Sequence, residues 1–116
     1  MGANEFTTAM TPSEFDSLAD AALARIAQAL DESEADCDCE PRSEGVLEIQ
    51  FSDSSRIVVN RHSAAQEIWV AAKSGGYHFR WTGSDWVDTR DGGELFAALS
   101  KLVSRHSGSP VVLRSA

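Results

Sequence analysis

The chain has 116 residues, of which 18 are acidic and 10 are basic, so its formal net charge is −8. This length is typical of one compact domain, and a hydrophobic fraction of 42% can fill a core, which excludes a disordered chain. The negative charge argues against nucleic acid and anionic membranes as partners, because their phosphate groups would be repelled.

The excess charge is concentrated in one segment. Between residues 31 and 40 there are no basic residues and six carboxylates: Asp31, Glu32, Glu34, Asp36, Asp38 and Glu40. The rest of the chain has 12 acidic and 10 basic residues, so this segment carries six of the eight excess charges. The main functional question is therefore what this segment binds.

The first residues carry no export signal. They lack the basic start and apolar run of a secretory leader, and no stretch of about 18 apolar residues could span a membrane. Met10 looks like a second start before a helix, so we expect residues 1–9 to be vector-derived or disordered and residues 10–116 to form one domain. Cys37 and Cys39 are too close for an unstrained disulfide, which favours reduced thiols in a cytoplasmic protein.

A first helix is predicted from Thr11, which can cap it, while Pro12 suits the first turn and Glu14 completes a capping box. Eight apolar residues then fall on one helical face, which predicts contact with a core: Phe15, Leu18, Ala19, Ala22, Leu23, Ile26, Ala29 and Leu30. A neighbouring face of the helix is acidic. It carries Asp16, Asp20 and Asp31, and also Glu34 if the helix extends that far.

After Pro41 apolar residues recur at every second position, which predicts strands over residues 46–51, 56–60, 67–72, 77–81 and 86–88. Turn signals at residues 53–55, 73–76 and 82–85 lie between successive strands, which indicates an antiparallel meander. Residues 91–94 offer a second capping box before helically spaced apolar residues at Leu95, Leu99, Leu102 and Val103.

Gly108 and Pro110 end this second helix, and residues 111–113 could add a short strand or cover the core. Two helices on one face of an antiparallel sheet would bury their apolar stripes and leave the other sheet face in water. The predicted fold class is therefore α+β, a two-layer sandwich.

The acidic segment suits cations or a basic protein surface, because crowded carboxylates repel one another until opposite charge arrives. An EF-hand is excluded, since a loop starting at Asp31 would need glycine at Asp36 and glutamate at Arg42, and one starting at Asp36 would need glycine at Pro41. Cation binding would therefore be shallow, multi-site and weak. The alternative is a solvated acidic face that only aids solubility.

No catalytic motif accompanies this segment, and we expect no enzyme. Cys37 and Cys39 lack a second ligand pair for zinc, and neighbouring carboxylates oppose thiolate formation, so we interpret both as incidental residues of a strand. The histidines His62, His78 and His106 show no metal-binding or catalytic spacing. The sequence also has no Gly-x-Ser-x-Gly elbow and no glycine-rich phosphate loop.

Trp69 is a candidate protein contact. If its neighbours Ile68 and Val70 face the helices, strand alternation places Trp69 on the open face of the sheet. The same parity puts four polar side chains on that face: Asn60, Glu67, His78 and Arg80. A tryptophan among them can anchor a protein partner, unless a loop covers it or it lies at the sheet edge.

Seven segments of the chain match a known family in order and spacing: residues 15–20, 38–40, 45–47, 57–61, 68–71, 75–79 and 81–87, the last reading Trp-Thr-Gly-Ser-Asp-Trp-Val. Together they resemble the frataxin family, most closely its bacterial branch, from about residue 13 to the second helix. The resemblance implies the same helix–meander–helix sandwich that the patterns predict.

The resemblance implies a cytoplasmic protein of iron–sulfur cluster assembly that binds iron weakly, as Fe2+ or Fe3+. We expect a monomer, because nothing in the sequence indicates an obligate interface. The implied partners are the cysteine desulfurase, whose rate it would modulate, and the cluster scaffold protein. The implied iron ridge comprises Asp20, Asp31, Glu32, Glu34, Asp36, Asp38 and Glu40. The implied sheet-face contact comprises Asn60 and Trp69, to which parity adds Glu67 and His78; Glu67 stands where the family commonly has glutamine.

Two other functions remain open. One is iron oxidation and storage, proposed for some frataxins, which would require oxygen-dependent consumption of Fe(II). The sequence shows no buried pair of carboxylate and histidine ligands for that reaction. An acidic adaptor or nucleic-acid mimic would cover a basic protein surface without any need for iron.

Overall fold

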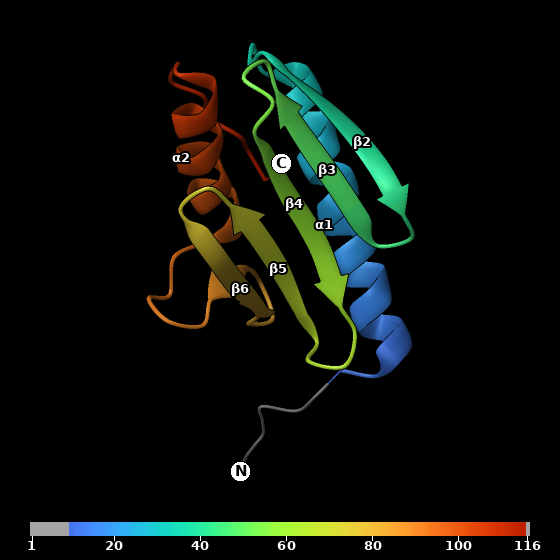
Figure 1. Ribbon diagram of the computed structural model, residues 1–116. Helices are drawn as coiled ribbons and strands as arrows, with labels where there is room; N and C mark the ends of the chain where they lie inside the picture. Colours follow the sequence, from blue (N-terminus) through green and yellow to red (C-terminus); the bar gives the residue numbers. More distant parts are fainter. Residues whose placement is uncertain (1–9, 116) are drawn as a thin grey trace.

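The structure is a computed structural model, and it describes residues 10–115 (Figure 1). The expectation for residues 1–9 lies outside the described residues. The elements follow in the order α1 (Pro12–Glu32), β2 (Cys37–Ser43), β3 (Val46–Phe51), β4 (Arg56–His62), β5 (Glu67–Ala72), β6 (Gly75–Trp81), β7 (Trp86–Asp88) and α2 (Leu95–Ser107). The strands form one antiparallel sheet in sequence order, which confirms the α+β two-layer sandwich.

Helix α1 begins as its sequence predicts. The Thr11 hydroxyl accepts a hydrogen bond from the Glu14 backbone N–H at 3.1 Å, and the Glu14 carboxylate accepts one from the Thr11 N–H at 2.8 Å. The helix ends at Glu32 with Ser33 as its cap, so Glu34 is not on the helix. Helix α1 therefore stops one residue after Asp31, and a short connection leads to β2 at Cys37.

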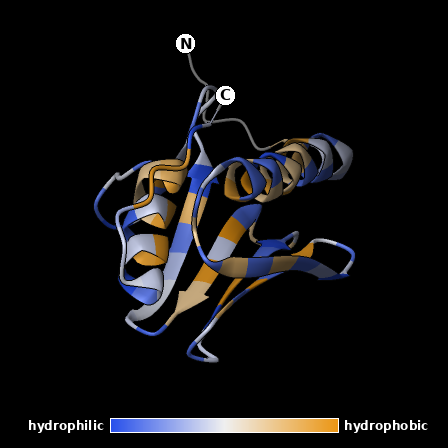
Figure 2. Ribbon diagram, turned by 90° about the horizontal axis from the view of Figure 1, so that it is seen from above, coloured by the Kyte–Doolittle hydropathy of each residue, from blue (hydrophilic) through white to orange (hydrophobic). Residues whose placement is uncertain are grey.

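The core lies between the two helices and one face of the sheet. Helix α1 lies behind β3 and β4 in the view of Figure 1, and the apolar residues of helices and strands gather between the layers in Figure 2. Alternate residues of the central strands are fully buried there, among them Ile49, Ile57, Val59, Ile68 and Phe79. The side chains between them face outward, so one sheet face stays open. No helix within residues 10–115 is long and apolar enough to cross a membrane.

Strand β2 has no boundaries in the sequence analysis, which located only its cysteines in a strand. It forms the outer edge of the sheet and pairs with β3 from Cys37 to Ser43. Pro41 is tolerated in it because an edge strand has one side without a hydrogen-bonding neighbour. The acidic segment thus ends in regular structure rather than in a loop.

Two predictions around α2 and the β5–β6 turn are wrong. Glu94, not Asp91, caps α2, and its carboxylate accepts hydrogen bonds from the N–H groups of Phe96 and Ala97, so there is no second capping box. Asp91 instead accepts a bond from the Gly93 N–H within the preceding loop. The predicted turn at residues 73–76 is shorter, because Gly75 already pairs with Ala72 in the sheet.

Of the two possibilities for residues 111–113, covering the core is correct and a strand is wrong. Val111 and Leu113 are buried, but they pair with no strand. The hydroxyls of Ser104 and Ser100, one turn apart on α2, accept hydrogen bonds from the Val111 and Leu113 N–H groups, both at 2.8 Å. Two serines of a helix thus take the place of a neighbouring strand.

Candidate functional site

The acidic side chains after α1 form a row on one side of the chain. From Ser33 to Glu40 half-buried and exposed residues alternate, and the exposed ones are Glu34, Asp36, Asp38 and Glu40. We call these four residues the acidic row. Ala35, Cys37 and Cys39 lie between them and pack against the core. Asp38 and Glu40 both lie on β2, where alternate side chains are about 6.7 Å apart on the same side. Before the strand, the Cys37 N–H donates to the Ala35 carbonyl at 3.1 Å, which makes a tight turn at Asp36.

Basic residues neutralise part of the predicted ridge. Arg25 forms an ion pair with Glu32 at 3.2 Å, and Arg42 forms one with Glu40, also at 3.2 Å. Within residues 10–115, four exposed ridge carboxylates form no ion pair: Asp31, Glu34, Asp36 and Asp38. We call these the unpaired quartet. They are the ridge residues whose charge is fully available to a cation or a basic protein.

Asp20 lies apart from the quartet. It is 11 residues before Asp31 on α1, which corresponds to about 16 Å along the helix axis. Arg61, at the end of β4, forms ion pairs with Asp20, with Asp16 at 3.6 Å and with Glu44 at 3.7 Å. Because a cation of the protein already occupies this end of the helix, Asp20 contributes little free negative charge to the predicted ridge.

The structure contains no closed metal cage in its described part. No group of three or more histidine, cysteine, aspartate or glutamate side chains within residues 10–115 is arranged to hold a metal ion. Burial raises the pKa of the Cys39 thiol to about 11, with a further contribution from Cys37, and burial followed by Asp38 and Asp36 raises that of Cys37. Both thiols are free and protonated at neutral pH, so the ridge can offer only exposed carboxylate oxygens.

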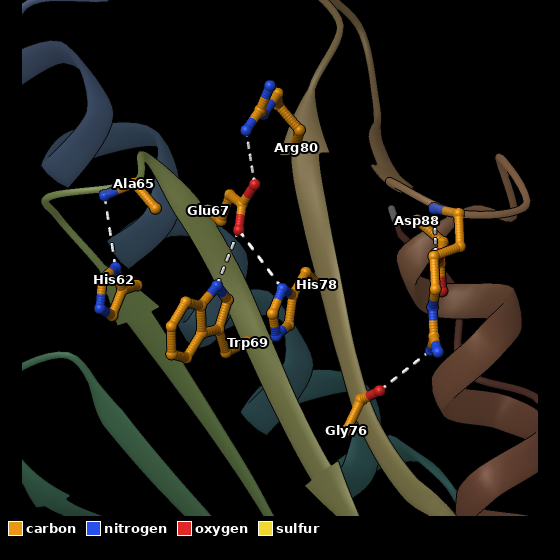
Figure 3. A network of polar contacts seen from close by, with 9 residues as sticks. His62, Ala65, Glu67, Trp69, Gly76, His78, Arg80 and Asp88 are labelled. Carbon is orange, nitrogen blue, oxygen red and sulfur yellow. Dashed lines mark hydrogen bonds and ion pairs between the residues drawn. The ribbon is translucent and has the colours of Figure 1, made fainter.

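The sheet-face residues come together around Trp69 (Figure 3). The indole lies between two imidazoles, with ring centroids 3.8 Å from His62 and 4.5 Å from His78, and the planes are parallel within 9°. Neighbouring strands supply these rings. His78 of β6 is the cross-strand partner of Trp69, and His62 of β4 lies two residues beyond Asn60, the partner of Trp69 on that strand. Trp69 is consequently half-buried, with both ring faces covered.

Glu67 lies under this stack rather than in solvent, with a side chain that is 9% exposed. One carboxylate oxygen accepts a hydrogen bond from the Trp69 indole N–H at 2.8 Å, and the other accepts one from the Arg80 guanidinium at 2.6 Å. His78 Nδ1 lies 3.6 Å from the first oxygen. Burial raises the pKa of Glu67, but the bonds from Trp69 and Arg80 together outweigh it and hold this pKa below its ordinary value.

Sequence reasoning missed His62 as part of this face. The signal was present, because His62 lies two residues after Asn60 and therefore on the same side of the strand. It also missed Glu48, which is buried on the open face between Arg42 and Arg56. Hydrogen bonds from Arg56 and Arg42 hold the pKa of Glu48 below its usual range.

His106 has a structural position on the helix side of the sheet. Its Nδ1 lies 2.9 Å from the Ser55 hydroxyl, which itself donates to Asp53, so Nδ1 carries the proton and donates. Its Nε2 accepts a bond from the Lys73 backbone N–H at 3.4 Å. Both ring nitrogens are committed, so this histidine has no free nitrogen for catalysis or metal binding.

Comparisons with known proteins agree with the geometry. A family model described as a frataxin-like domain matches residues 8–109. An iron–sulfur cluster assembly protein CyaY of Dechloromonas aromatica is 57% identical over 90% of this chain and 100% of its own length. The protein of the same name from a Janthinobacterium species is 54% identical over 92% of this chain and 99% of its own length.

Solved structures match as well. Frataxin from Psychromonas ingrahamii, a member of the CyaY family, superposes with a TM-score of 0.82 and 29% identity, covering 89% of this chain and 97% of the other. Yeast frataxin gives a TM-score of 0.66 at 22% identity over 91% and 94% of the two chains, which supports the fold alone. The resemblance to the bacterial branch that the sequence segments indicated is confirmed.

Proposed function

This chain belongs to the frataxin family, and from that premise we propose that it acts in iron–sulfur cluster assembly as an iron-binding regulator or iron donor. It docks on the cysteine desulfurase through the ridge formed by the unpaired quartet. The protein does not itself catalyse a reaction, and it works in the cytoplasm as a monomer. The observation that carries the proposal is the unpaired quartet itself: four exposed carboxylates at the end of α1 and the start of β2 that no basic residue within residues 10–115 neutralises.

The quartet suits a basic protein surface. Exposed carboxylates that follow one another from the end of α1 to β2 create a negative potential that a partner's arginines and lysines can meet at several points. Such contacts mainly speed association, and they weaken as salt screens the charges, with a Debye length of about 8 Å at physiological ionic strength. Docking on the desulfurase is therefore fast and strongly dependent on salt.

Iron is cargo on this surface. Carboxylate oxygens suit hard cations, and Asp36 and Asp38 hold theirs at the edge of the sheet, open to water. Without a third ligand at coordination distance each iron ion keeps most of its water ligands, so affinity is low and release is easy. These are the properties of a donor or sensor rather than of a storage cage.

Iron and the desulfurase compete for the same carboxylates. Bound iron cancels part of the charge that attracts the partner, so iron loading weakens docking and changes the regulatory effect. The sheet face supplies a second contact, in which Asn60 and the edge of Trp69 meet the partner or the cluster scaffold protein. Glu67 and Arg80 hold the indole in place for that contact.

An anaerobic titration with Fe(II), followed by backbone NMR, tests this proposal. We expect paramagnetic broadening at residues 31–38, and weaker broadening at Asp16 and Asp20, which Arg61 already neutralises. The double variant Asp36→Asn/Asp38→Asn should lose most of the broadening. The control Asp85→Asn/Asp91→Asn removes the same charge from exposed sites elsewhere and should keep it.

The same titration separates the two alternatives. Iron oxidation and storage requires Fe(II) to be consumed when oxygen is admitted, together with iron-driven oligomers. An iron-independent adaptor requires no broadening at any ridge residue while the protein still binds the desulfurase tightly. Either result would refute the proposed function.

A further inference from the structure

A cavity of about 190 Å³ lies between α2 and the loop that precedes it. Tyr77 of β6 and Asp88 at the end of β7 form one side, and α2 contributes Ala97, Lys101 and Arg105. None of these residues belongs to the acidic row or to the stack around Trp69. The cavity is therefore separate from both surfaces of the proposed function.

Asp88 lines this cavity, and within residues 10–115 only one of its two carboxylate oxygens accepts a hydrogen bond. The residue is only 6% exposed, and its Oδ1 accepts a hydrogen bond from the Arg90 backbone N–H at 2.7 Å. No residue in the described range 10–115 donates to the other oxygen, Oδ2; the Arg90 guanidinium approaches only Oδ1, with Nε at 3.9 Å. A buried carboxylate oxygen without a donor is costly, so Asp88 is ready to accept a bond from a ligand.

The other acidic side chains of the lining differ from Asp88 in their bonding or in their exposure. Asp91 accepts the Gly93 N–H at 2.8 Å, and the two oxygens of Glu94 accept the Phe96 and Ala97 N–H groups at the start of α2. The first of these bonds lies within the loop, and the other two cap α2. Asp91 Oδ2 has no donor within residues 10–115 either, but Asp91 is exposed to water, so Asp88 is the buried acidic group that remains available.

Positive charge lines the cavity from the side of α2. Lys101 and Arg105 are one helical turn apart, and within residues 10–115 neither forms an ion pair or side-chain hydrogen bond. The Tyr77 ring and the methyl groups of Ala97 and Ala98 complete the lining with apolar surface. A buried anion and two free cations therefore share one small space.

We propose that this cavity binds a small zwitterion, with its ammonium group at Asp88 and its carboxylate at Lys101 and Arg105. A simple cation would leave both basic residues unused, and a simple anion would be repelled by Asp88. The size agrees, because 190 Å³ lies below the roughly 300–1,000 Å³ of sites for drug-sized ligands, which points to a compound of amino-acid size. The proposal is independent of the iron ridge.

Tyr77 is the only tyrosine of the chain, so labelling with 3-fluorotyrosine gives one ¹⁹F NMR signal inside the cavity. We would titrate the protein with glycine, β-alanine and 4-aminobutyrate, whose charges are increasingly far apart. At least one should shift the signal saturably, and the best of them reports the spacing of the charges. Butylammonium and butyrate, each with one of the charges, should bind at least tenfold more weakly.

Variants connect the signal to the charges. Asp88→Asn keeps the acceptor for the Arg90 N–H but loses the charge, and it should weaken binding about tenfold or more. Arg105→Gln should weaken binding several-fold, whereas Arg114→Gln, the same change at an exposed site outside the lining, should leave it unchanged. Ala97→Leu fills the cavity without changing any charge and should abolish binding even if Asp88→Asn fails to fold.

Three results would overturn the proposal. One is the absence of any saturable shift with all three zwitterions. Another is equal binding of butylammonium or butyrate, which would mean that one charge suffices. The third is wild-type binding by Ala97→Leu, which would place the ligand elsewhere.

Discussion

At Glu67 this chain has a carboxylate where a glutamine amide would fill the same space and could still accept the Trp69 indole N–H. The difference lies in Arg80, whose guanidinium bonds to the second oxygen at 2.6 Å and is itself 63% exposed. The carboxylate therefore links two strands by charge while it orients the indole between His62 and His78. This residue determines how the open face presents its tryptophan.

Glu67→Gln should lower the free energy of unfolding at pH 7 by about 1–2 kcal/mol, because a charge-assisted bond in a mostly buried place becomes a neutral one. The folded-state pKa of Glu67 lies below its ordinary value of 4.5, so its contribution is present above that value. It is lost as pH falls through the folded pKa. Urea unfolding should thus show a gap between the two proteins at pH 7 that closes in acid.

Glu44→Gln is the control, because Glu44 is 87% exposed and should change stability by less than about 0.5 kcal/mol. A gap between wild type and Glu67→Gln that stayed constant down to pH 3 would contradict the assigned role of the charge.

His106 joins three segments through its neutral ring. It accepts the Lys73 N–H, donates to Ser55, and packs against the Phe51 ring, with centroids 4.9 Å apart and the planes tilted by 33°. Burial, followed by the nearby Lys73 charge, lowers the pKa of His106, while Asp53 opposes this shift only in part. Protonation would remove the acceptor of the Lys73 N–H.

The depressed pKa means that the unfolded state takes up the proton first. The contribution of His106 is complete above its ordinary pKa of 6.5 and is lost as pH falls through the folded value. His106→Asn should cost about 1–2 kcal/mol at pH 8 and lose less stability than wild type on acidification to pH 5. Parallel stability curves for the two proteins across this range would rule out the assignment.

Among the elements, the β2–β3 turn is fixed to α1 through Arg61. Gly45 in this turn has a φ of +78°, and a Cβ atom there would lie 2.7 Å from Cγ and 2.8 Å from Nε of Arg61. Arg61 in turn holds Asp16 and Asp20 of α1 and donates its backbone N–H to the Gly45 carbonyl at 2.9 Å. The turn therefore positions the edge strand that carries the acidic row.

Gly45→Ala should destabilise the fold by about 2–3 kcal/mol, since it combines a left-handed backbone with displacement of Arg61. Gly108→Ala is a matched control, with φ of +77° and open space around the added Cβ, and should cost only about 1 kcal/mol. Chemical denaturation of both variants measures the difference. Equal losses would mean that Arg61 does not constrain the turn.

Sequence patterns predicted elements where one periodicity dominates. Helix α1 has both a capping box and a continuous apolar stripe, and β3 to β5 alternate cleanly, so the start of α1 and the boundaries of these strands were found within two residues. Strand β2 was not delimited, because its inward residues are Cys37 and Cys39 and its outward ones are acidic, which hides the alternation. The start of α2 was displaced because Asp91 and Glu94 have capping-box spacing, and only the loop geometry decides which of them caps.

Across the whole molecule, the carboxylates behind the net charge of −8 are of two kinds: those that pair with an arginine and those that do not. The sequence located the acidic segment, and its ordered motifs identified the family. It could not tell which carboxylates are free, because Arg61, Arg42 and Arg25 reach their partners through the folded arrangement. Likewise, the covering of Trp69 by His62 and His78 depends on strand register, which a single sequence does not contain.

We propose that the unpaired quartet mediates the effect of this protein on the cysteine desulfurase. The most direct measurement is sulfide production by that enzyme during titration with this protein, with and without Fe(II). The variant Asp31→Asn/Glu34→Gln/Asp36→Asn/Asp38→Asn should need at least tenfold more protein for the same effect, because it lacks the charges that attract the partner. Its effect should also no longer depend on iron, whereas the control Asp85→Asn/Asp91→Asn should behave as wild type. A quartet variant as potent as the parent would show that these four carboxylates do not mediate the effect.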